Sequence, residues 1–394
     1  MKTKICLVLT AQTLKEDLAL VELYRPWIDL AELRVDCLNP EERLHFRKFP
    51  ELSNIPCILT IRRKSDGGKY VEGEGARTAL LARGLAFAET DPRKNFSFID
   101  LEEDLQVPSI EEAARAFGTR IIRSMHNMTG PETDIQAHVK RLRKTRDEIA
   151  KIAFMPRSLS DVTNLFREAK GCTGEDVILI AMGAFGMPSR ILAPILGSFI
   201  TFTTSEDMAR SGQNTLGQID PVTINEIYRI REIGPKTRIF GITGNPLAAT
   251  SSPHIHNKGY RDQGLDAVYL PIRAETVEEA LEFAEEVGIE GLSVTYPFKE
   301  SVLPNLAQIS SQTGEIGACN TILRENGDWR GFNTDAPGFS RALLEFLGCE
   351  NLKKKRVSII GAGGAARAIA HAVHALEGRA CIFNRTTDKA RELA

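Results

Sequence analysis

The chain has 394 residues, of which 42% are hydrophobic and 26% are charged. This length suits two or three domains of roughly 150 residues, each large enough to bury a core of its own. Lys plus Arg number 50 against 52 for Asp plus Glu, so the net charge of −2 excludes a broad electrostatic attraction to nucleic acid or anionic lipid. We therefore expect any anion to be bound locally.

The seven cysteines lie far apart and form no Cys-x-x-Cys pair, and no His/Cys cluster has metal-ligand spacing. We therefore predict no metal site, and the scattered thiols favour a cytoplasmic protein. The run Ile5 to Leu9 is too short for a signal peptide and predicts a buried strand. The longest apolar region, Val177 to Phe202, is interrupted by Gly183 and Pro188, so no membrane span is expected.

Up to residue 231, short apolar runs alternate with longer amphipathic segments such as Gly75 to Glu89, Thr133 to Glu148 and Ser158 to Lys170. Such runs predict parallel strands buried on both faces and joined by helices, and eight of them fit a closed (β/α)8 barrel. An open doubly wound sheet of the same elements is the alternative. The expected strands are Ile5 to Thr10, Ile28 to Val35, Cys57 to Ile61, Phe96 to Leu101, Arg120 to Met125, Ile149 to Met155, Val177 to Met182 and Phe199 to Thr203.

Polar or charged residues close nearly every one of these runs. Because barrel enzymes carry their chemistry at the C-terminal ends of the strands, we expect these residues to converge on one rim, although any single one could be an ordinary loop charge. They include Glu32, Arg34, Asp36, Arg62, Arg63, Asp100, Glu102, His126, Lys151 and Arg190.

Lys151 lies inside an apolar strand, where a charged ammonium is costly. Burial lowers the pKa of a lysine and yields a neutral amine that can attack a ketone. His126 closes the preceding run, so it could remove a proton made acidic by an imine on Lys151. The alternative is a structural lysine held in an ion pair.

Arginines that could hold a carboxylate stand at two further strand ends. Arg190 follows Gly186-Met187-Pro188-Ser189, and Arg62 closes the third run. A guanidinium binds a carboxylate through two parallel hydrogen bonds. Glu32 and Arg34 are two residues apart on one strand, so they project to the same side and could contact hydroxyl groups.

The order and spacing of these segments resemble type I 3-dehydroquinate dehydratase over essentially residues 1 to 225. The resemblance implies that Lys151 forms a Schiff base with the substrate ketone and that His126 transfers the neighbouring proton and assists loss of water. It also implies that Arg190 binds the carboxylate and that Glu32, Arg34, Arg62 and Gln213 line the pocket. The segments are Glu32-Leu33-Arg34-Val35-Asp36, Thr60-Ile61-Arg62, Asp100-Leu101-Glu102, Ser124-Met125-His126-Asn127, Lys151-Ile152-Ala153 and Ser189-Arg190.

Two segments depart from that family's pattern. Asp66-Gly67-Gly68 has Asp where the family has Glu, so the carboxylate expected to orient the histidine is one methylene shorter. Ala209-Arg210-Ser211 stands before Gly212-Gln213, where the family has Ser-Ala-Pro.

A second α/β region follows the breaker pair Gly234-Pro235. The apolar run Val357 to Ile360 leads into the glycine-rich turn Gly361-Ala362-Gly363-Gly364-Ala365-Ala366, which has the G-x-G-x-x-G/A form of a dinucleotide-binding turn. Asn384-Arg385-Thr386 stands where an NAD site would carry an acidic residue, and Arg385 suits the 2′-phosphate of NADP. The alternative is a turn needed only for close helix packing. The expected strands are Arg238 to Ile242, Ala267 to Ile272, Gly291 to Thr295, Cys319 to Leu323, Val357 to Ile360 and Cys381 to Phe383.

Polar clusters that close these runs resemble shikimate dehydrogenase over residues 238 to 394. The resemblance implies that Lys299 and Asp335 are the acid/base pair and that Thr250, Ser252, Thr295 and Asn320 contact the substrate. It assigns the cofactor to Gly361, Gly363, Gly364, Ala365, Asn384, Arg385 and Thr386. Ala249-Thr250 replaces a His-Ser pair of the family. The clusters are Gly244-Asn245-Pro246, Ser252-Pro253, Ser293 to Lys299, Gly317 to Thr321 and Gly331 to Asp335.

Together these features predict a barrel over residues 1–231, a substrate-binding α/β domain over 238–338 and the first part of a Rossmann NADP-binding domain over 339–394. The resemblances imply a fused enzyme of the shikimate pathway that dehydrates 3-dehydroquinate and then reduces 3-dehydroshikimate with NADPH. We expect small-molecule substrates, with no nucleic-acid or membrane partner, and a chain that is a fragment of a longer protein. The alternatives are non-catalytic metabolite- or nucleotide-binding modules, or a dehydrogenase that prefers quinate.

Overall fold

The computed structural model describes residues 2–86, 89–172, 174, 176–211, 216–247 and 250–394. These residues fall into two compact units, one formed by Met1–Thr237 with His256–Val268 and the other by Arg238–Ile255 with Tyr269–Ala394. None of the helices described combines the length and the apolar character needed to cross a bilayer.

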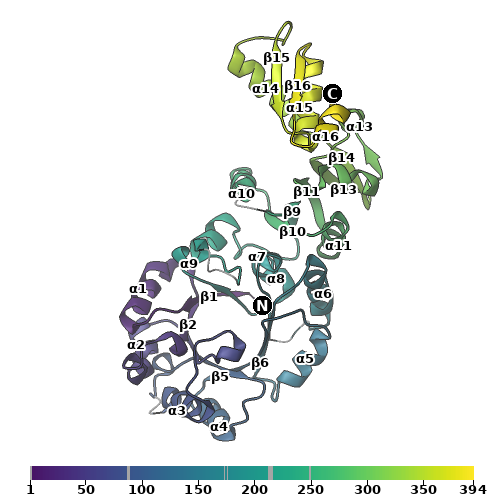
Figure 1. The fold of residues 1–394 in the computed structure, drawn as a ribbon. Coiled ribbons are helices and arrows are strands. Elements are labelled where there is room, and N and C mark those ends of the chain that lie inside the picture. Colours follow the sequence, from purple (N-terminus) through teal and green to yellow (C-terminus); the bar gives the residue numbers. More distant parts are fainter. Residues whose placement is uncertain (1, 87–88, 173, 175, 212–215, 248–249) are drawn as a thin grey trace. The chain divides into compact units, whose positions relative to one another are not determined.

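The first unit is built on eight parallel strands, each paired with the next along the chain, and β8 pairs back onto β1. An isolated bridge between Val177 and Ser198 joins β7 to β8, and Phe199 N donates to Val177 O at 2.7 Å. The predicted (β/α)8 barrel is therefore confirmed, and the open sheet is not formed (Figure 1). The strands are β1 (Lys4–Leu9), β2 (Leu30–Arg34), β3 (Cys57–Thr60), β4 (Phe98–Glu102), β5 (Arg120–Asn127), β6 (Ile149–Phe154), β7 (Val177–Ala181) and β8 (Ile200–Thr203).

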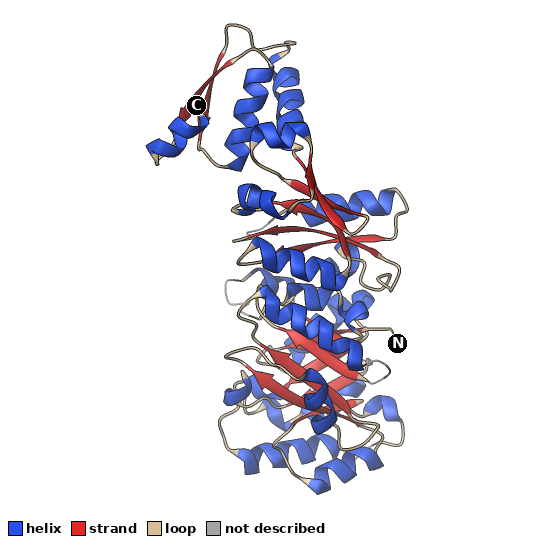
Figure 2. Cartoon of the chain, turned by 90° about the vertical axis from the view of Figure 1, so that its right-hand side faces the viewer, coloured by secondary structure: helices blue, strands red, loops and turns tan. Residues whose placement is uncertain are grey.

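Helices lie outside this ring of strands and cover its outer face (Figures 1 and 2). The helix expected over residues 133–148 is shorter, because the backbone leaves the helix at the extended Arg143 and the buried Glu148 accepts a hydrogen bond from Lys144 N at 2.9 Å. The helices are α1 (Leu14–Tyr24), α2 (Phe49–Ser53), α3 (Glu74–Leu85), α4 (Pro108–Ala116), α5 (Ile135–Leu142), α6 (Leu159–Ala169), α7 (Met187–Ile191), α8 (Ala193–Leu196) and α9 (Glu206–Arg210).

The barrel interior has an apolar lower layer and a charged upper layer. Strand side chains alternate between faces, so residues two apart point the same way. Leu30, Phe98 and Ile149 belong to the buried apolar cluster inside the barrel. Two residues further along the same strands stand Glu32, Asp100 and Lys151, all buried. The alternation of each strand therefore places the charges at the C-terminal end of the barrel, above the apolar layer.

The second unit contains a six-stranded mixed sheet and a two-stranded parallel sheet. The sequence did not predict the hairpin of β13 and β14, whose two-residue turn is Asn326-Gly327 with φ of 55° and 94°. The strands are β9 (Arg238–Gly244), β10 (Ala267–Arg273), β11 (Ile289–Val294), β12 (Gln308–Ile309), β13 (Thr321–Glu325), β14 (Asp328–Phe332), β15 (Arg356–Ile360) and β16 (Arg379–Phe383). The helices are α10 (Ser252–Asp262), α11 (Val277–Val287), α12 (Phe298–Ser301), α13 (Ser311–Ile316), α14 (Asp335–Leu347), α15 (Gly364–Ala375) and α16 (Thr387–Leu393).

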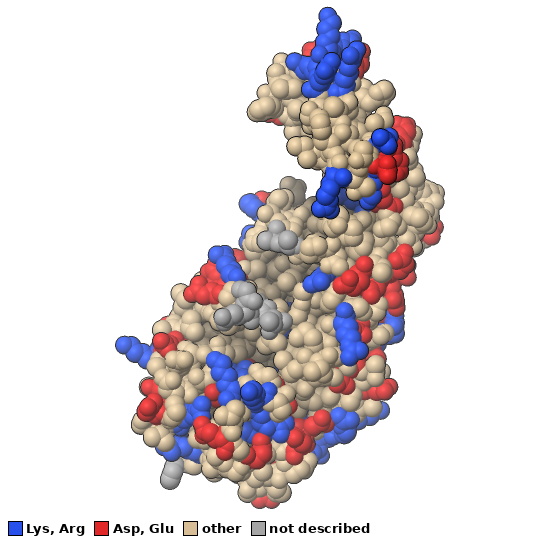
Figure 3. All heavy atoms as spheres, in the orientation of Figure 1, with Lys and Arg blue, Asp and Glu red and all other residues tan. Residues whose placement is uncertain are grey.

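Acidic and basic side chains are interspersed over the barrel face seen in Figure 3. This mixture agrees with the near-neutral net charge of −2. An anion that binds this face therefore needs a local arrangement of donors rather than a surface of one sign.

Gly186 allows the turn between β7 and α7 to pack against the barrel. A Cβ at this position would lie 2.1 Å from Ala181 O and 2.6 Å from Met182 O, and a backbone carbonyl cannot easily move aside. We expect Gly186→Ala to lower the free energy of unfolding by about 2 kcal/mol or more, measured by urea denaturation.

Gly75→Ala is the matched control, because a Cβ at Gly75 in α3 meets no heavy atom within 4 Å. We expect this control to be unchanged or more stable by up to about 1 kcal/mol. An unchanged urea midpoint for Gly186→Ala would show that the close approach is not required.

Two candidate active sites

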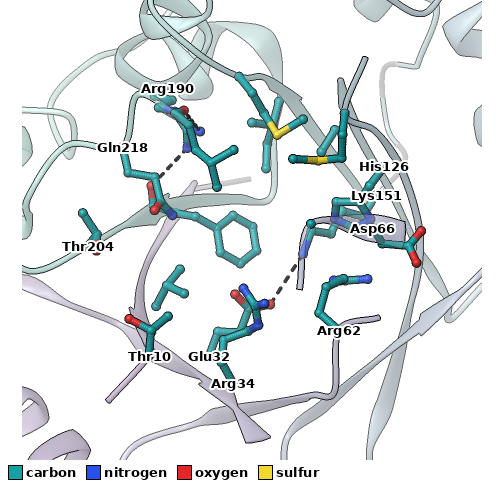
Figure 4. A pocket seen from close by; sticks show the side chains of 18 of the residues that line it. Thr10, Glu32, Arg34, Arg62, Asp66, His126, Lys151, Arg190, Thr204 and Gln218 are labelled. Atoms are coloured by element: carbon teal, nitrogen blue, oxygen red, sulfur yellow. Dashed lines mark hydrogen bonds and ion pairs between the residues drawn. The ribbon is translucent and has the colours of Figure 1, made fainter. Parts of the chain in front are cut away.

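A cavity of about 210 Å³ opens at the C-terminal end of the barrel (Figure 4). It collects predicted site residues from five different segments, because the strand ends meet at this rim. The predicted site residues in its wall are Glu32, Arg34, Arg62, His126, Lys151 and Arg190. The other lining residues are Val8, Thr10, Asp66, Gly67, Met128, Ala153, Ile180, Met182, Phe202, Thr204, Met208, Leu216 and Gln218.

Lys151 is buried as expected, with 4% of its surface exposed, but it is not isolated. Its Nζ donates to Asp100 Oδ2 at 2.9 Å, and Glu32 Oε1 lies 3.6 Å away. The Phe202 ring covers the same nitrogen, 4.4 Å from the ring centroid to Nζ. The sequence analysis expected Asp100 at the same rim but did not name it as the partner of Lys151. The amine is ion-paired, as the alternative interpretation of this lysine expected, and it also faces the cavity.

Arg62 is a second partner of the Asp100 carboxylate that binds Lys151. Its NH2 donates to Asp100 Oδ2 at 2.8 Å, and its NH1 donates to Glu102 Oε1 at 2.7 Å and to Ser124 Oγ at 3.2 Å. Although burial opposes the charged form of Asp100, the cations Arg62 and Lys151 hold the pKa of this carboxyl well below its usual range. Both terminal nitrogens of Arg62 therefore already have partners within the barrel, and its contact to a substrate carboxylate stays a prediction.

His126 stands two residues beyond Ser124, which is the register partner of Lys151 in β5. Removal from water, with the nearby cations Arg62 and Lys151, holds the pKa of His126 well below its usual value of 6.5. Its Nδ1 has no hydrogen-bond partner in the described part of the chain. The carboxylate of Asp66 accepts instead from Arg63 Nε at 2.7 Å and Ser65 Oγ at 2.9 Å. The imidazole is therefore neutral and able to accept a proton.

Arg190 is a buried cation with no carboxylate among its described partners. Its NH1 and NH2 donate only to carbonyl oxygens, Phe202 O at 3.3 Å and Leu216 O at 2.7 Å, and its buried Nε has no partner. Burial lowers the pKa of Arg190 from 12.5 to about 10. An uncompensated guanidinium in a cavity wall is a site for an anion.

Gln213, the remaining predicted residue of this cavity, lies outside the described residues. A second Gly-Gln pair follows five residues later, and its Gln218 lines the cavity close to Arg190 (Figure 4). The neighbouring backbone is fixed to the barrel, because Gly183 N donates to Leu216 O at 3.0 Å and Thr204 N to Ile219 O at 3.2 Å. The repeated dipeptide was the signal that sequence reasoning could have used.

Arg34 and Glu32 complete the polar wall on β2. Arg34 binds Asp36 through two hydrogen bonds of 2.9 Å and 2.8 Å, and Asp36 also accepts from the backbone N of Arg62 and of Lys69. Glu32 Oε1 accepts from Thr60 Oγ1 at 2.9 Å. Both side chains are therefore held in place before any ligand arrives.

In the second unit, Lys299, Asp335 and Asn320 form one hydrogen-bonded cluster. Lys299 Nζ donates to Asp335 Oδ2 at 2.5 Å, and Asn320 Nδ2 donates to Asp335 Oδ1 at 2.8 Å. Asn333 Oδ1 accepts from the backbone N of Asp335 at 3.1 Å, which fixes the first turn of α14. The cluster places a cation and a carboxylate side by side, so one of them can give or take a proton at a bound hydroxyl. The amide of Asn320 holds the carboxylate in place.

Thr250 and Ser252 form a separate pair at the start of α10, with 3.1 Å between the two Oγ atoms. Thr295 lies on the loop after β11, in the wall of a second cavity. Ala249, which departs from the family pattern, lies outside the described residues.

The second cavity, of about 700 Å³, brings the predicted cofactor residues beside Lys299 and Thr295. Gly361 has a φ of +116°, and a Cβ at Gly361 or Gly363 would meet no heavy atom within 4 Å, so open space faces the turn. At Gly364 a Cβ would lie 2.7 Å from Lys299 Cβ, so glycine lets the turn pack against the lysine. Asn384, Arg385 and Thr386 line the same cavity, together with Lys389, which the sequence reading missed.

Comparisons with known proteins match both parts of the chain. A family model described as type I 3-dehydroquinase matches residues 5–235, and one described as the shikimate dehydrogenase substrate binding domain matches residues 242–322.

The chain is similar to a chloroplastic bifunctional 3-dehydroquinate dehydratase/shikimate dehydrogenase from Arabidopsis thaliana, 30% identical over 93% of this chain and 62% of that protein. It is also similar to a shikimate dehydrogenase (NADP(+)) from Shouchella clausii, 41% identical over 40% of this chain and 58% of that protein. The chain thus spans about three fifths of these relatives. The crystal structure of 3-dehydroquinate dehydratase from Geobacillus kaustophilus has the same barrel fold, with a TM-score of 0.51 at 21% identity over 58% of this chain and 91% of that chain.

The low pKa of His126 can be measured directly. We expect its ring signals in NMR spectra of the ¹⁵N-His protein to keep neutral-imidazole shifts as the pH falls through 6.5, with protonation only well below that value. His126→Gln assigns the signals. Because the unfolded chain takes up this proton near pH 6.5 and the folded chain does not, the free energy of unfolding should fall with acidification below that pH, and less steeply in His126→Gln. A half-protonated ring at pH 6.5 would contradict the proposed environment.

Proposed function

Because the chain belongs to the type I 3-dehydroquinase family, we propose that its barrel dehydrates 3-dehydroquinate to 3-dehydroshikimate. We further propose that the region after residue 238 reduces 3-dehydroshikimate to shikimate with NADPH. The observation that carries the first proposal is the buried Lys151 amine in one cavity with the neutral His126 and the unpaired cation of Arg190. The cluster of Lys299, Asp335 and Asn320 beside the glycine-rich turn carries the second.

The dehydration begins with attack by Lys151. After Nζ has lost its proton, its electron pair adds to the ketone carbon and the carbonyl pair moves to oxygen. That oxygen is protonated and leaves as water, so that Nζ becomes a protonated imine. The positive charge stays where Asp100 Oδ2 stands 2.9 Å from the nitrogen, so the carboxylate stabilises both the ammonium and the imine.

The protonated imine makes the adjacent C–H acidic, and His126 removes this proton. The C–H electron pair forms an enamine while the imine electron pair moves to nitrogen. The enamine then expels the hydroxyl of the next carbon, which departs as water with the proton that His126 holds. Hydrolysis of the conjugated imine releases 3-dehydroshikimate and the free Lys151.

The carboxylate of 3-dehydroquinate would bind Arg190, because among the described residues this guanidinium has no anionic partner and its Nε has no hydrogen-bond partner. Gln218 replaces Gln213 in our assignment, since it lines the cavity beside Arg190. Glu32 and Arg34 are proposed hydroxyl contacts, and Arg62 holds the carboxylate that pairs with Lys151.

In the second site, Lys299 and Asp335 would hold the proton at the ring hydroxyl that exchanges with the ketone. Asn320, which already binds Asp335, would fix a neighbouring hydroxyl, and Thr250, Ser252 and Thr295 would contact the rest of the ring. A charged pair that shares its proton with the substrate oxygen supplies both acid and base for carbonyl reduction.

The residues of the second cavity fit NADP. The backbone of Gly361, Gly363, Gly364 and Ala365 at the start of α15 suits a pyrophosphate, and Asn384, Arg385 and Thr386 suit the 2′-phosphate, with Lys389 as a second cation. When bound, the nicotinamide supplies the hydride. We place the protein in the cytoplasm, since all seven cysteines are free.

The first test is covalent trapping. Borohydride with 3-dehydroquinate should reduce the imine to a secondary amine on Lys151, located by peptide mapping. The mass added is that of the bound ligand less one water, lost in imine formation, plus two hydrogens from the reduction. Lys151→Ala should show no adduct and lose turnover by more than about 10⁴-fold, followed by absorbance of the conjugated enone product. Arg190→Gln is the matched variant, and it should raise KM while the adduct still forms at high substrate. Normal turnover by Lys151→Ala would overturn the assignment.

The second test separates chemistry from cofactor binding. We expect Lys299→Met to lose shikimate oxidation while NADPH fluorescence titration shows unchanged binding. Arg385→Gln should weaken NADPH binding by about tenfold or more, with little change for NADH, because it removes one charge-assisted contact to the 2′-phosphate. Quinate offered in place of shikimate identifies the preferred substrate. A wild-type chain that binds neither dinucleotide would contradict the second half of the proposal.

A further inference from the structure

Arg77 lies outside the barrel cavity and is fully buried, with 0% of its surface exposed. It stands on α3, and its NH1 donates to Glu102 Oε2 at 2.5 Å and to the carbonyl of Ile61 at 3.1 Å. Its Nε and NH2 donate to Oε2 of Glu74, a half-exposed residue of the same helix, at 3.1 Å and 2.8 Å. Burial of an arginine costs free energy unless its charge is compensated, so a fully buried Arg77 has a specific electrostatic role.

The contact to Glu102 connects Arg77 to the reacting amine. Glu102 Oε1 accepts from Arg62 NH1 at 2.7 Å, and Arg62 NH2 donates to Asp100 Oδ2 at 2.8 Å. The same Asp100 oxygen accepts from Lys151 Nζ at 2.9 Å. Charges of opposite sign therefore alternate from α3, through β4 and the end of β3, to β6.

Glu32, 3.6 Å from Lys151 Nζ, completes a set of three cations and three carboxylates. We call these six groups, Arg77, Glu102, Arg62, Asp100, Lys151 and Glu32, the charge array. Glu74, which also pairs with Arg77, is half-exposed, so water screens its charge and it is not counted in the array. The six groups sum to zero charge while Nζ is positive, as in an ammonium or a protonated imine. The other five groups therefore act on Nζ with one net negative charge.

We propose that Arg77 is a positioning residue that tunes proton release from Lys151 by neutralising Glu102. Without Arg77, the rest of the array would carry two net negative charges, and the ammonium would give up its proton less readily. The free amine that attacks the ketone would then form only at higher pH. This inference rests on the proposed Schiff-base reaction and adds to it a residue that does not line the cavity.

The titratable or charged groups that face Lys151 from the elements packed around it stay in place in the variants below. They are Cys6 on β1, Glu32 and Arg34 on β2, Arg62 after β3, Asp100 on β4 and His126 on β5.

The test measures imine formation in a single turnover as a function of pH, with each sample quenched into borohydride and the adduct quantified by intact mass. For Arg77→Gln we expect the half-maximal rate to shift to higher pH by about one unit, the effect of one charge roughly 10 Å away in a medium of effective dielectric constant ~20. Arg77→Lys should largely restore the wild-type profile. Arg83→Gln, on the exposed part of the same helix, is the matched control and should not shift it.

Two further variants distinguish an electrostatic effect of Arg77 on Lys151 from structural damage caused by the substitution. Glu102→Gln leaves one carboxylate fewer, so its profile should shift to lower pH even if Arg77→Gln does not fold. The double variant Arg77→Gln/Glu102→Gln restores the charge balance and should return the profile to within about 0.3 pH unit of wild type. A merely structural role predicts that the double variant is at least as impaired as either single one.

The outcomes distinguish this inference from the function on which it rests. A wild-type protein that forms no adduct rejects the Schiff-base proposal itself. Wild-type trapping with a Glu102→Gln profile that coincides with it, or a double variant displaced as far as Arg77→Gln, overturns the role of Arg77.

Discussion

The contact between the Lys151 ammonium and the Asp100 carboxylate, 2.9 Å apart inside the barrel, is the interaction on which the first site depends. A buried charge is tolerated only with a partner, and a buried partner needs further hydrogen bonds of its own. Asp100 therefore also accepts from Arg62 and from Ser124 Oγ, and Arg62 in turn requires Glu102. A single buried amine thus requires several further buried polar groups in the barrel, each of which binds the next.

The barrel could be predicted from the sequence because its strands are short apolar runs with polar ends. The same pattern indicated Lys151 and His126, since a charged residue inside an apolar strand and a histidine at a strand end are local features. The pairing of Lys151 with Asp100 depends on how β4 and β6 curve toward each other across β5, and no spacing in the sequence encodes that. Gln218 was missed because two Gly-Gln pairs stand five residues apart, and only the backbone contacts of residues 216–219 place the second one.

In the second unit, the glycine-rich turn could be predicted from the sequence, whereas the hairpin of β13 and β14 could not. β13 ends in Arg324 and Glu325 and β14 begins with Asp328, so their apolar signal is weak, although Asn326-Gly327 is a strong two-residue turn signal. The glycine-rich turn was recognisable because its G-x-G-x-x-A spacing stands directly between a strand and a helix. Contact between Gly364 and the Lys299 side chain was not foreseeable, because it joins residues 65 positions apart.

The junction between β7 and β8 gives the barrel an asymmetry. β8 pairs with β1 over four register positions, whereas in the described part of the chain an isolated bridge at Val177 and Ser198 joins it to β7. Arg190, on the helix that follows β7, reaches across this seam to the carbonyl of Phe202 on β8. The side chain that we propose as the anion-binding group thus also contacts β8 at the junction where β7 and β8 share a single bridge in the described part of the chain. A ligand bound to Arg190 would restrain this side chain and so stabilise the junction between β7 and β8. Ligand binding and the stability of the closed barrel are therefore linked.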